Sequence, residues 1–596
     1  MSKRLRLGLV VCALMVFGVQ PALADAVRAG EVANELTSIG KVPTSGQVLL
    51  VTFTDRPGRA IVETRMGGLG AVSESVPELG IWALAPSRAA TARAQVLTRP
   101  QVARAEWSML RKTDDLTDAR PVPPPALPLI AAAEPTDPYY AVVGQYQQWS
   151  LHQGNWAFGL SGYDRPTIAI LDSGVDGSHE EWRQPGLLVF PRSTFQHVNR
   201  ADDISDKGHG THVAGIAAAP ADGIGVVGVA PASANPALPG VSKVMPVQIS
   251  DVQGVSQDST MIAGIRWAVN HGAKVINISS GGPGASNAFQ DTVNWAFKRG
   301  ALIVASVGNE GLPDPLNPQS VNLVNFPAGY DHVIGVGALC DGLVRLPDCP
   351  ESFGRARFSN FNYTVDVMAP GVNIVSTLPL AVHDREVDGA PGYGFKDGTS
   401  MAAPYVAGVV ALIYASHPGI TPYQVTRILQ ATSSGATAGF ARSKRFGWGA
   451  VNPLLAAQAQ APVDDLSEIN DDVKWLPKRD TLRVTRTPIQ VTARMDYNDD
   501  QFDNYAVQLR KGERMKVTII SQRAKLGLTV YRPGTSSVVL GVRTAEQLAA
   551  KWLGQIRRPT PGTRTVVVRA KETGRHFIAL NALAGGDDYT LVIRRL

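Results

Sequence analysis

Four polar residues, widely separated along the chain, are of types that could together carry out nucleophilic catalysis. Asp172 ends the run TIAILD, His209 lies in DKGHGTHVAG, Asn309 follows ALIVASVG, and Ser400 stands in DGTSMAAP. A serine hydroxyl is a weak nucleophile that needs a neighbouring base, and histidine can serve as that base. A carboxylate can orient the histidine, and an amide N–H can stabilise a developing oxyanion. These four residue types are therefore sufficient for acyl transfer.

Each residue also has a simpler interpretation when it is considered alone. Asp172 could cap a loop, Asn309 could form a turn, and Ser400 could cap the helix that the following apolar run predicts. His209 and His212 share one helical face, which raises the possibility of a zinc site. A third zinc ligand is not evident near this pair, so we interpret His212 as a buried structural residue.

The segments around these residues predict the elements that would position them. Short β-branched runs, namely TIAILDSG, VMPVQIS, KVINISS, ALIVASVGN and VIGVGAL, alternate with helix-length segments. This pattern predicts an α/β domain with a parallel sheet covered on both faces. In such a sheet, functional groups gather at the carboxyl ends of the strands, where Asp172 and Asn309 are expected. Pro404 is expected in the first turn of the helix that Ser400 opens.

The chain order of the acid, the base and the nucleophile adds a stronger signal. Together with the motifs D-S-G, G-H-G-T-H-V-A-G, G-N-E and G-T-S-M-A-x-P-x-V-A-G, it resembles the subtilisin-like serine peptidase (subtilase) family over residues 136–457. The resemblance implies that Ser400 attacks the scissile carbonyl and that His209 transfers the proton. It also implies that Asp172 orients the imidazole and that Asn309 donates to the oxyanion with the Ser400 N–H. No cofactor is expected for the chemistry.

The same resemblance implies a peptide-binding groove. NISSGGPG is similar to the family's substrate strand, which would pair with an extended peptide through backbone hydrogen bonds. Asn325 stands where many members have glycine, which leaves the depth of the primary pocket open, and Glu310 at its mouth would favour a basic side chain. The expected substrate-binding residues are Ser279, Ser280, Gly281, Gly254, Gly308 and Asn325.

A structural calcium site is a further implication of the resemblance. The stretch ADGIGVVGVAP is similar to the family's calcium loop, although Ala221 and Gly223 replace residues that are frequently polar. The alternative is a hydrogen-bonded turn that holds no ion. The expected ligands are the side chains of Glu181 and Asp222 and the carbonyl groups of Ile224 and Val226.

Composition divides the chain into four parts. Residues 1–24 combine a basic start, a thirteen-residue apolar run and an A-x-A site, which predicts a signal peptide and export to the periplasm or the exterior; an uncleaved anchor is the alternative. Residues 25–135 predict a small α+β unit and a Pro/Ala-rich linker, and the resemblance implies that this unit is the family's inhibitory prodomain. The resemblance also implies a subtilisin-like three-layer domain over 136–460. Alternating runs predict an all-β sandwich over 470–596, with a helix near AEQLAAKWLGQI.

Charge and cysteines add two expectations. The formal net charge is +6, and residues 470–596 alone contain 23 lysines and arginines against 12 acidic residues. This segment could contact an anionic surface or present a solvated basic face, and a nucleic-acid partner is not expected. Cys340 and Cys349 could form a disulfide in an oxidising compartment, the alternative being two free thiols.

Together these patterns predict a secreted serine endopeptidase that is made as an autoprocessed precursor. Its substrates would be proteins or peptides, and its own prodomain would act as an intramolecular inhibitor. The alternative from another functional class is a catalytically silent subtilase-fold protein that binds peptides or surfaces. An esterase or lipase would need G-x-S-x-G around the nucleophile, and Ser400 lacks this motif.

Overall fold

The computed structural model contains two compact units, Lys41–Asp464 and a C-terminal unit that includes Asp465–Leu596. The expected signal peptide lies outside the described residues. The structure describes residues 44–113, 120–121, 137–141, 148–152, 166–232, 242–312, 322–340, 349, 354–382, 392–439, 442–462, 464–465, 468–470, 473–476, 478–496, 502–535, 538, 550–556, 559–584 and 586–596.

A seven-stranded sheet forms the centre of the larger unit, in the order β14-β13-β12-β10-β6-β8-β7. All neighbouring pairs are parallel. The apolar side chains of its central strands are buried on both faces, as the continuous β-branched runs predict. The strands are β6 (Thr167–Asp172), β7 (Arg192–Ser193), β8 (Lys243–Gln248), β10 (Ala273–Ile278), β12 (Leu302–Ser306), β13 (Val333–Leu339) and β14 (Val367–Pro370).

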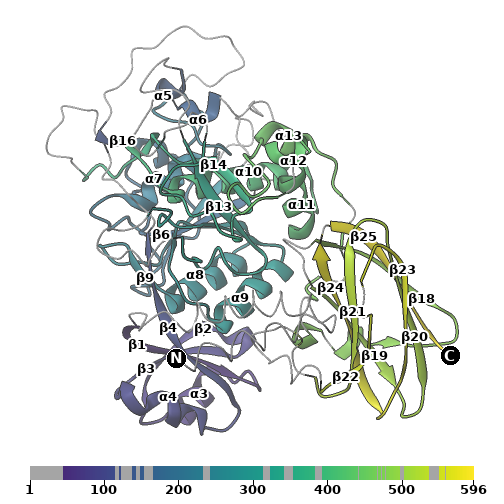
Figure 1. The fold of residues 1–596 in the computed structure, drawn as a ribbon. Helices are drawn as coiled ribbons and strands as arrows, with labels where there is room; N and C mark the ends of the chain where they lie inside the picture. The colour runs from purple at the N-terminus through teal and green to yellow at the C-terminus, as the bar shows by residue number, and fades with distance from the viewer. Residues whose placement is uncertain are drawn as a thin grey trace, which may run out of the picture. The chain divides into compact units, whose positions relative to one another are not determined.

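Helices cover both faces of this sheet, so the predicted three-layer α/β fold is confirmed (Figure 1). On one face, α7 (His209–Ala218) and α10 (Thr399–Ser416) pack against each other and against the central strands. On the other face, α8 (Asp258–Asn270) and α9 (Asn287–Lys298) form a second pair. Helix α10 is long and apolar enough to cross a membrane, but it is 94% buried in the core.

A smaller α+β module precedes the central sheet within the same unit. Its antiparallel strands lie in the order β4-β1-β3-β2, and helices α3 (Arg59–Arg65) and α4 (Ala89–Leu97) pack on one face. Side chains from the other face, such as Leu50 and Ile81, join the core that contains α8 and α9. The strands are β1 (Thr44–Phe53), β2 (Gly70–Val76), β3 (Ile81–Pro86) and β4 (Val102–Thr113).

Shorter elements complete the larger unit. Cys340 and Cys349 form a disulfide, which confirms that prediction. Among the described residues, the other strands are β5 (Arg120–Pro121), β9 (Val255–Gln257), β11 (Ser280–Gly281), β15 (Ile374–Thr377) and β16 (Tyr393–Lys396), and the other α-helices are α5 (Pro138–Ala141), α6 (Trp149–His152), α11 (Pro422–Thr432), α12 (Ser434–Thr437) and α13 (Pro453–Gln458).

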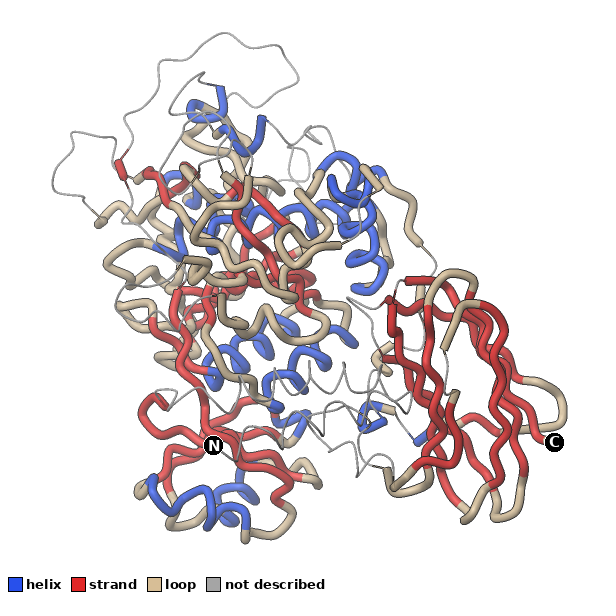
Figure 2. The backbone as a smooth tube through the Cα atoms, viewed as in Figure 1, coloured by secondary structure: helices blue, strands red, loops and turns tan. Residues whose placement is uncertain are grey.

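The C-terminal unit is a sandwich of two sheets that enclose one apolar core, as predicted (Figure 2). The prediction of a helix near AEQLAAKWLGQI is wrong for the part that the structure describes, because Trp552–Gln555 is an edge strand paired with β21. The strand pairing overrides the local helix propensity. The strands are β17 (Leu482–Arg483), β18 (Ile489–Asp496), β19 (Phe502–Leu509), β20 (Arg514–Ser521), β21 (Lys525–Tyr531), β22 (Trp552–Gln555), β23 (Gly562–Arg569), β24 (Gly574–Ala584) and β25 (Gly586–Arg595).

Candidate functional site

Asp172 and His209 meet at the carboxyl edge of the central sheet. Asp172 ends β6, and His209 is the first residue of α7. The His209 Nδ1 atom lies 2.7 Å from Asp172 Oδ1, and both side chains are buried. A carboxylate at Nδ1 leaves the other ring nitrogen, Nε2, as the group that can exchange a proton.

Asp203 holds the two segments that carry Asp172 and His209 in place. The sequence analysis did not identify Asp203. Its Oδ1 atom accepts a hydrogen bond from Ser173 Oγ, and its Oδ2 atom accepts bonds from the N–H and hydroxyl of Thr211. Ser173 Oγ also accepts from the Gly210 N–H, so the turn after β6 is tied to the first turn of α7. Burial raises the pKa of Asp203 above its usual value. Asp203 is therefore a positioning residue.

Ser400 is the second residue of α10 and is fully buried. The helix begins earlier than expected, so Pro404 lies in its second turn and the prediction of a first-turn proline is wrong. Because Pro404 has no N–H, it cannot donate to the Ser400 carbonyl four residues before it. The hydroxyl of Ser279 donates to that carbonyl instead, at 2.9 Å. In return, Ser400 Oγ donates to the Ser279 carbonyl, also at 2.9 Å.

Neighbouring strands bring the nucleophile candidate to the same edge as the acid–base pair. Strand β10 lies beside β6, and Ile278 lies opposite Leu171. The next residues along the two strands, Ser279 and Asp172, therefore lie at the same end of the sheet. Since α7 and α10 pack together, the helix starts that carry His209 and Ser400 belong to one layer. The structure therefore gathers these residues from four distant parts of the chain.

Asn309 follows β12 and is held in one orientation. Its carboxamide oxygen accepts hydrogen bonds from the N–H and the hydroxyl of Thr399, both at 3.0 Å. Because the oxygen is engaged on that side, Nδ2 is the atom that can donate to an oxyanion. The contact also ties Asn309 to the residue directly before Ser400.

The expected peptide-binding residues flank strand β4 of the N-terminal module. This strand pairs with β11, where Thr113 lies opposite Ser280 and Lys112 lies opposite Gly281, and with β9 on its other side. The Thr113 N–H donates to the Gly254 carbonyl at 3.2 Å. A side chain at Gly254, which has a φ of +73°, would collide with Thr113, so glycine permits this close approach.

Gly308 and Asn325 converge beside the groove, as their expected role in a primary pocket requires. Gly308 has a φ of +98°, and an added Cβ there would lie 2.3 Å from Asn325 Nδ2 and 2.5 Å from Glu310 Oε2. Asn325 also approaches Gly281 and is buried. Glu310 accepts a hydrogen bond from Asn360 at 2.8 Å, and burial raises its pKa. The polar side chains of Asn325 and Glu310 therefore lie together beside Gly308.

The expected calcium ligands lie around a turn that also involves Asp137. The N–H groups of Asp222 and Gly223 donate to Asp137 Oδ1, and the Val226 N–H donates to Glu181 Oε1 at 2.8 Å. Burial raises the pKa of Asp137 to about 7 and raises that of Glu181 as well, and nearby carboxylates add to both effects. In the described part of the chain, the second oxygens of Asp137 and Glu181 are buried without hydrogen-bond partners.

This arrangement fits a hard cation bound by oxygen atoms, because two buried carboxylate oxygens are unsatisfied there. Among the described residues, no three acidic, histidine or cysteine side chains converge enough to hold a metal by themselves. Backbone carbonyls would therefore have to contribute, as expected for Ile224 and Val226. Sequence analysis missed Asp137, which lies in the proline-rich stretch EPTDP without a recognisable ligand motif.

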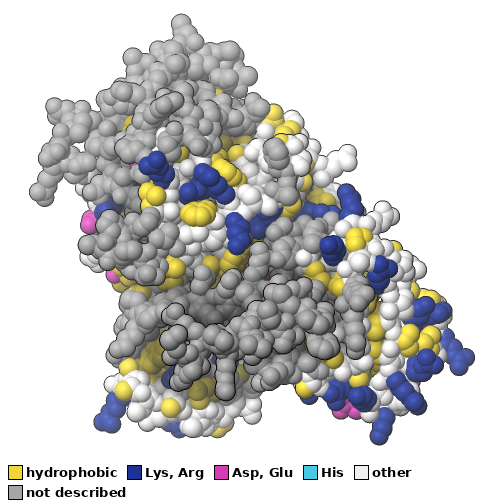
Figure 3. Space-filling model, in the orientation of Figure 1, with side chains coloured by type: hydrophobic (Ala, Val, Ile, Leu, Met, Phe, Trp, Pro, Cys, Tyr) yellow, Lys and Arg dark blue, Asp and Glu magenta, His cyan; other side chains and the backbone are white. Residues whose placement is uncertain are grey.

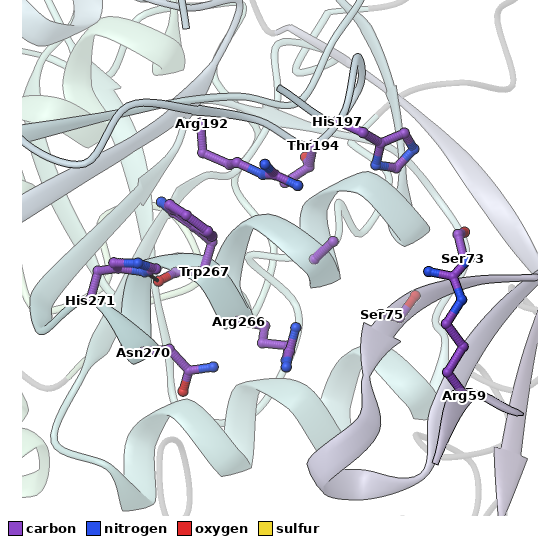
Figure 4. A pocket seen from close by; sticks show the side chains of 11 residues that line it. Arg59, Ser73, Ser75, Arg192, Thr194, His197, Arg266, Trp267, Asn270 and His271 are labelled. Carbon is purple, nitrogen blue, oxygen red and sulfur yellow. Dashed lines mark hydrogen bonds between the residues drawn. The ribbon is translucent and has the colours of Figure 1, made fainter. Parts of the chain in front are cut away.

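A cavity of about 550 Å³ lies elsewhere, where the N-terminal module meets α8 (Figure 4). Arg59 and Ser73 line it from the module, and Arg192 and Trp267 line it from the sheet domain. None of the predicted site residues contributes to this lining. We therefore assign the chemistry to the sheet edge and not to this cavity.

Comparison with known proteins agrees with this geometry. The model of the subtilase family matches residues 164–449. Subtilisin from Bacillus pumilus is 38% identical over 291 residues, which cover 49% of this chain and 90% of that protein. Subtilisin E from Bacillus subtilis (strain 168) is also 38% identical over 291 residues, but the match covers 65% of its length.

A similar fold is found in a solved structure. Fervidolysin from Fervidobacterium pennivorans, described as a keratinolytic enzyme related to subtilisin, superposes with a TM-score of 0.58 at 21% identity. The superposition covers 92% of each chain. By sequence, fervidolysin is 36% identical over 281 residues, which cover 45% of this chain and 37% of that protein.

Proposed function

Because the chain belongs to the subtilase family of serine endopeptidases, we propose that Asp172, His209 and Ser400 form its catalytic triad. His209 takes the proton from Ser400 as Oγ attacks the scissile carbonyl, which gives a tetrahedral intermediate. His209 then passes the proton to the leaving amine as the C–N bond breaks, which leaves the acyl-enzyme. Water hydrolyses the acyl-enzyme in the second half of the reaction. The observation that carries the proposal is the buried 2.7 Å contact between His209 Nδ1 and Asp172 Oδ1.

The hydrogen bonds of Ser400 and Asn309 support their assigned roles. A hydroxyl has one proton, so Ser400 Oγ–H must turn from the Ser279 carbonyl towards His209 before the proton can be transferred. Asn309 Nδ2 and the Ser400 N–H then donate to the negative oxygen of the tetrahedral intermediate. These donors need no rearrangement, because Thr399 already fixes the Asn309 amide.

We extend the proposal to the precursor form. Strand β4 occupies the edges where an extended peptide would pair, which supports the assignment of residues 25–135 as an inhibitory prodomain with its linker. Removal of this strand would open the groove. Export through the signal-like residues 1–24, autocatalytic cleavage and the boundaries of 136–460 and 470–596 belong to the same proposal.

A structural calcium ion is the first proposed partner. We propose that it is held by Asp137, Glu181 and Asp222 together with the carbonyls of Ile224 and Val226. Such an ion would neutralise the buried carboxylates of its loop and take no part in peptide hydrolysis.

An anionic surface is the second proposed partner. On the face drawn in Figure 3, lysine and arginine side chains gather over the C-terminal sandwich. Arg514 and Arg569 pair across its exposed sheet, with Lys516 two residues further along β20. Like charges directly opposite each other are unfavourable in a sheet, so an anion would relieve this repulsion.

Casein hydrolysis tests the enzymatic proposal. The wild-type chain should release its N-terminal module and digest casein, whereas Ser400→Ala should do neither and Ser416→Ala should behave as the wild type. A Ser400→Ala protein that processed itself and cut casein at the wild-type rate would overturn the proposal. A wild-type protein that bound casein without cutting it would instead support the silent, peptide-binding alternative.

A further inference from the structure

Strand β4 buries an arginine in the peptide-binding groove. The Arg111 side chain is fully buried, and its Nε atom donates to Asp258 Oδ1 at 2.8 Å. Its Nη1 atom donates to the carbonyls of Gly282 and Pro283, at 2.6 and 3.0 Å. Its Nη2 atom donates to the Gly284 carbonyl at 2.8 Å. One carboxylate and three carbonyls therefore surround the guanidinium.

All four acceptors belong to the peptidase domain and not to the N-terminal module. Asp258 is the first residue of α8 and is itself fully buried, and the three carbonyls follow β11. An uncompensated buried charge is costly, so this site suits a cation with several donors in a planar fork. A lysine ammonium could not reproduce the spacing of three separate nitrogen donors.

The strand register gives the position of this arginine relative to the nucleophile. Thr113 lies opposite Ser280, so the next position of a peptide in the same groove lies opposite Ser279. The Ser279 carbonyl is the acceptor of the Ser400 hydroxyl. A substrate residue opposite Ser279 would therefore present its carbonyl to Ser400. Arg111 occupies the position three residues before that residue.

We propose that Asp258 and the carbonyls of Gly282, Pro283 and Gly284 form a subsite that selects arginine in substrates. The selected arginine lies three residues before the residue whose carbonyl is attacked. In the precursor, Arg111 of strand β4 occupies the subsite. When strand β4 leaves, the same carboxylate and carbonyl groups become accessible to substrate peptides. This inference rests on the proposed peptidase function and specifies its substrate class.

Two peptide pools test the subsite directly. One pool has arginine at a fixed position and the other has citrulline, and both are randomised at the remaining positions. Citrulline keeps the length and planarity of arginine but loses its charge and one donor group. The matured wild-type enzyme should cleave the arginine pool with a kcat/KM about 10- to 100-fold higher, because hydrogen bonds to a charged group are lost. The cut should fall after the third residue beyond the arginine.

Variants separate selection from a purely structural role. Asp258→Asn should reduce the preference for arginine over citrulline to about threefold or less, because the carboxylate that pairs with the guanidinium is lost. Asp251→Asn, which changes a carboxylate near the groove edge, should keep the full preference. Cleavage of the two peptide pools by the wild-type enzyme tests the arginine subsite even if the Asp258→Asn protein does not fold.

The outcomes also distinguish the inference from its premise. Equal cleavage of both pools by an enzyme that Ser400→Ala inactivates would overturn the arginine subsite and leave the peptidase function intact. Cleavage of both pools by Ser400→Ala at the wild-type rate would overturn the proposed function and the subsite with it.

Discussion

At the scale of single residues, the candidate site combines groups that local motifs reveal with groups that only the fold brings together. Asp172 and His209 are 37 residues apart, yet their side chains form a buried hydrogen bond. Each stands in a short motif whose residue types already predict chemistry. Asp203 has no such motif, and its importance follows only from its bonds to Ser173 and Thr211.

Asn309→Ala should lower kcat strongly and change KM little, because the lost donor acts on the oxyanion and not on the bound substrate. Loss of one such donor from subtilisin lowers kcat about 10²- to 10³-fold, and a loss in the same range is expected here. Steady-state kinetics on a quenched peptide checks this, with Asn287→Ala on α9 as the control. An equal rise in KM with kcat unchanged would assign Asn309 to substrate binding instead.

At the scale of elements, the parallel sheet and its helices could be predicted because buried runs and helix-length segments alternate along the chain. The start of α10 was predicted less accurately, because a proline inside a helix normally lies in the first turn, and Pro404 does not. Here a contact from Ser279, 121 residues away, satisfies the carbonyl that the proline leaves open. Asp137 and Arg111 were missed for the same reason, since their partners lie 85 and 147 residues away.

The stability of the fold should depend on pH through His212, a buried residue of helix α7. Burial, and then the charge of Lys396, hold the pKa of His212 well below its usual value of 6.5. A lowered pKa means that the unfolded state takes up the proton first, so stability is present above pH 6.5 and lost as the pH falls. The loss should reach about 1.4 kcal/mol for each pH unit below that value.

Urea unfolding of the Ser400→Ala protein at several pH values checks this without autolysis. His212→Gln retains a donor for the Gly394 carbonyl and should remove this part of the pH dependence. His197→Gln, at an exposed site, should keep it. A His212→Gln protein with the same slope as its parent would contradict the assignment.

The loop that contains Asp222 should respond to metal removal. Calcium at 100 times its Kd would stabilise the folded protein by about 2.7 kcal/mol, so EGTA should lower Tm and added calcium should restore it. Asp137→Asn should abolish the response, whereas Asp202→Asn, an exposed acid in another loop, should retain it. Differential scanning calorimetry of the Ser400→Ala protein provides the measurement, and a Tm that is indifferent to EGTA would exclude the ion.

At the scale of the whole molecule, the chain combines a peptidase fold, an N-terminal module whose strand β4 pairs with β9 and β11, and a separate β-sandwich. Fold class could be predicted because each part has its own periodicity in sequence. The pairing of β4 with strands β9 and β11 could not be predicted, because it joins residues more than 140 positions apart. The proposed specificity for arginine is inferred from that pairing and not from any motif.

The most direct test of the central claim is to label the matured protein with a fluorophosphonate and map the adduct by peptide mass spectrometry. The account predicts one adduct, on the peptide that contains Ser400. An adduct on a different serine, or no adduct on the Ser400 peptide, would contradict it.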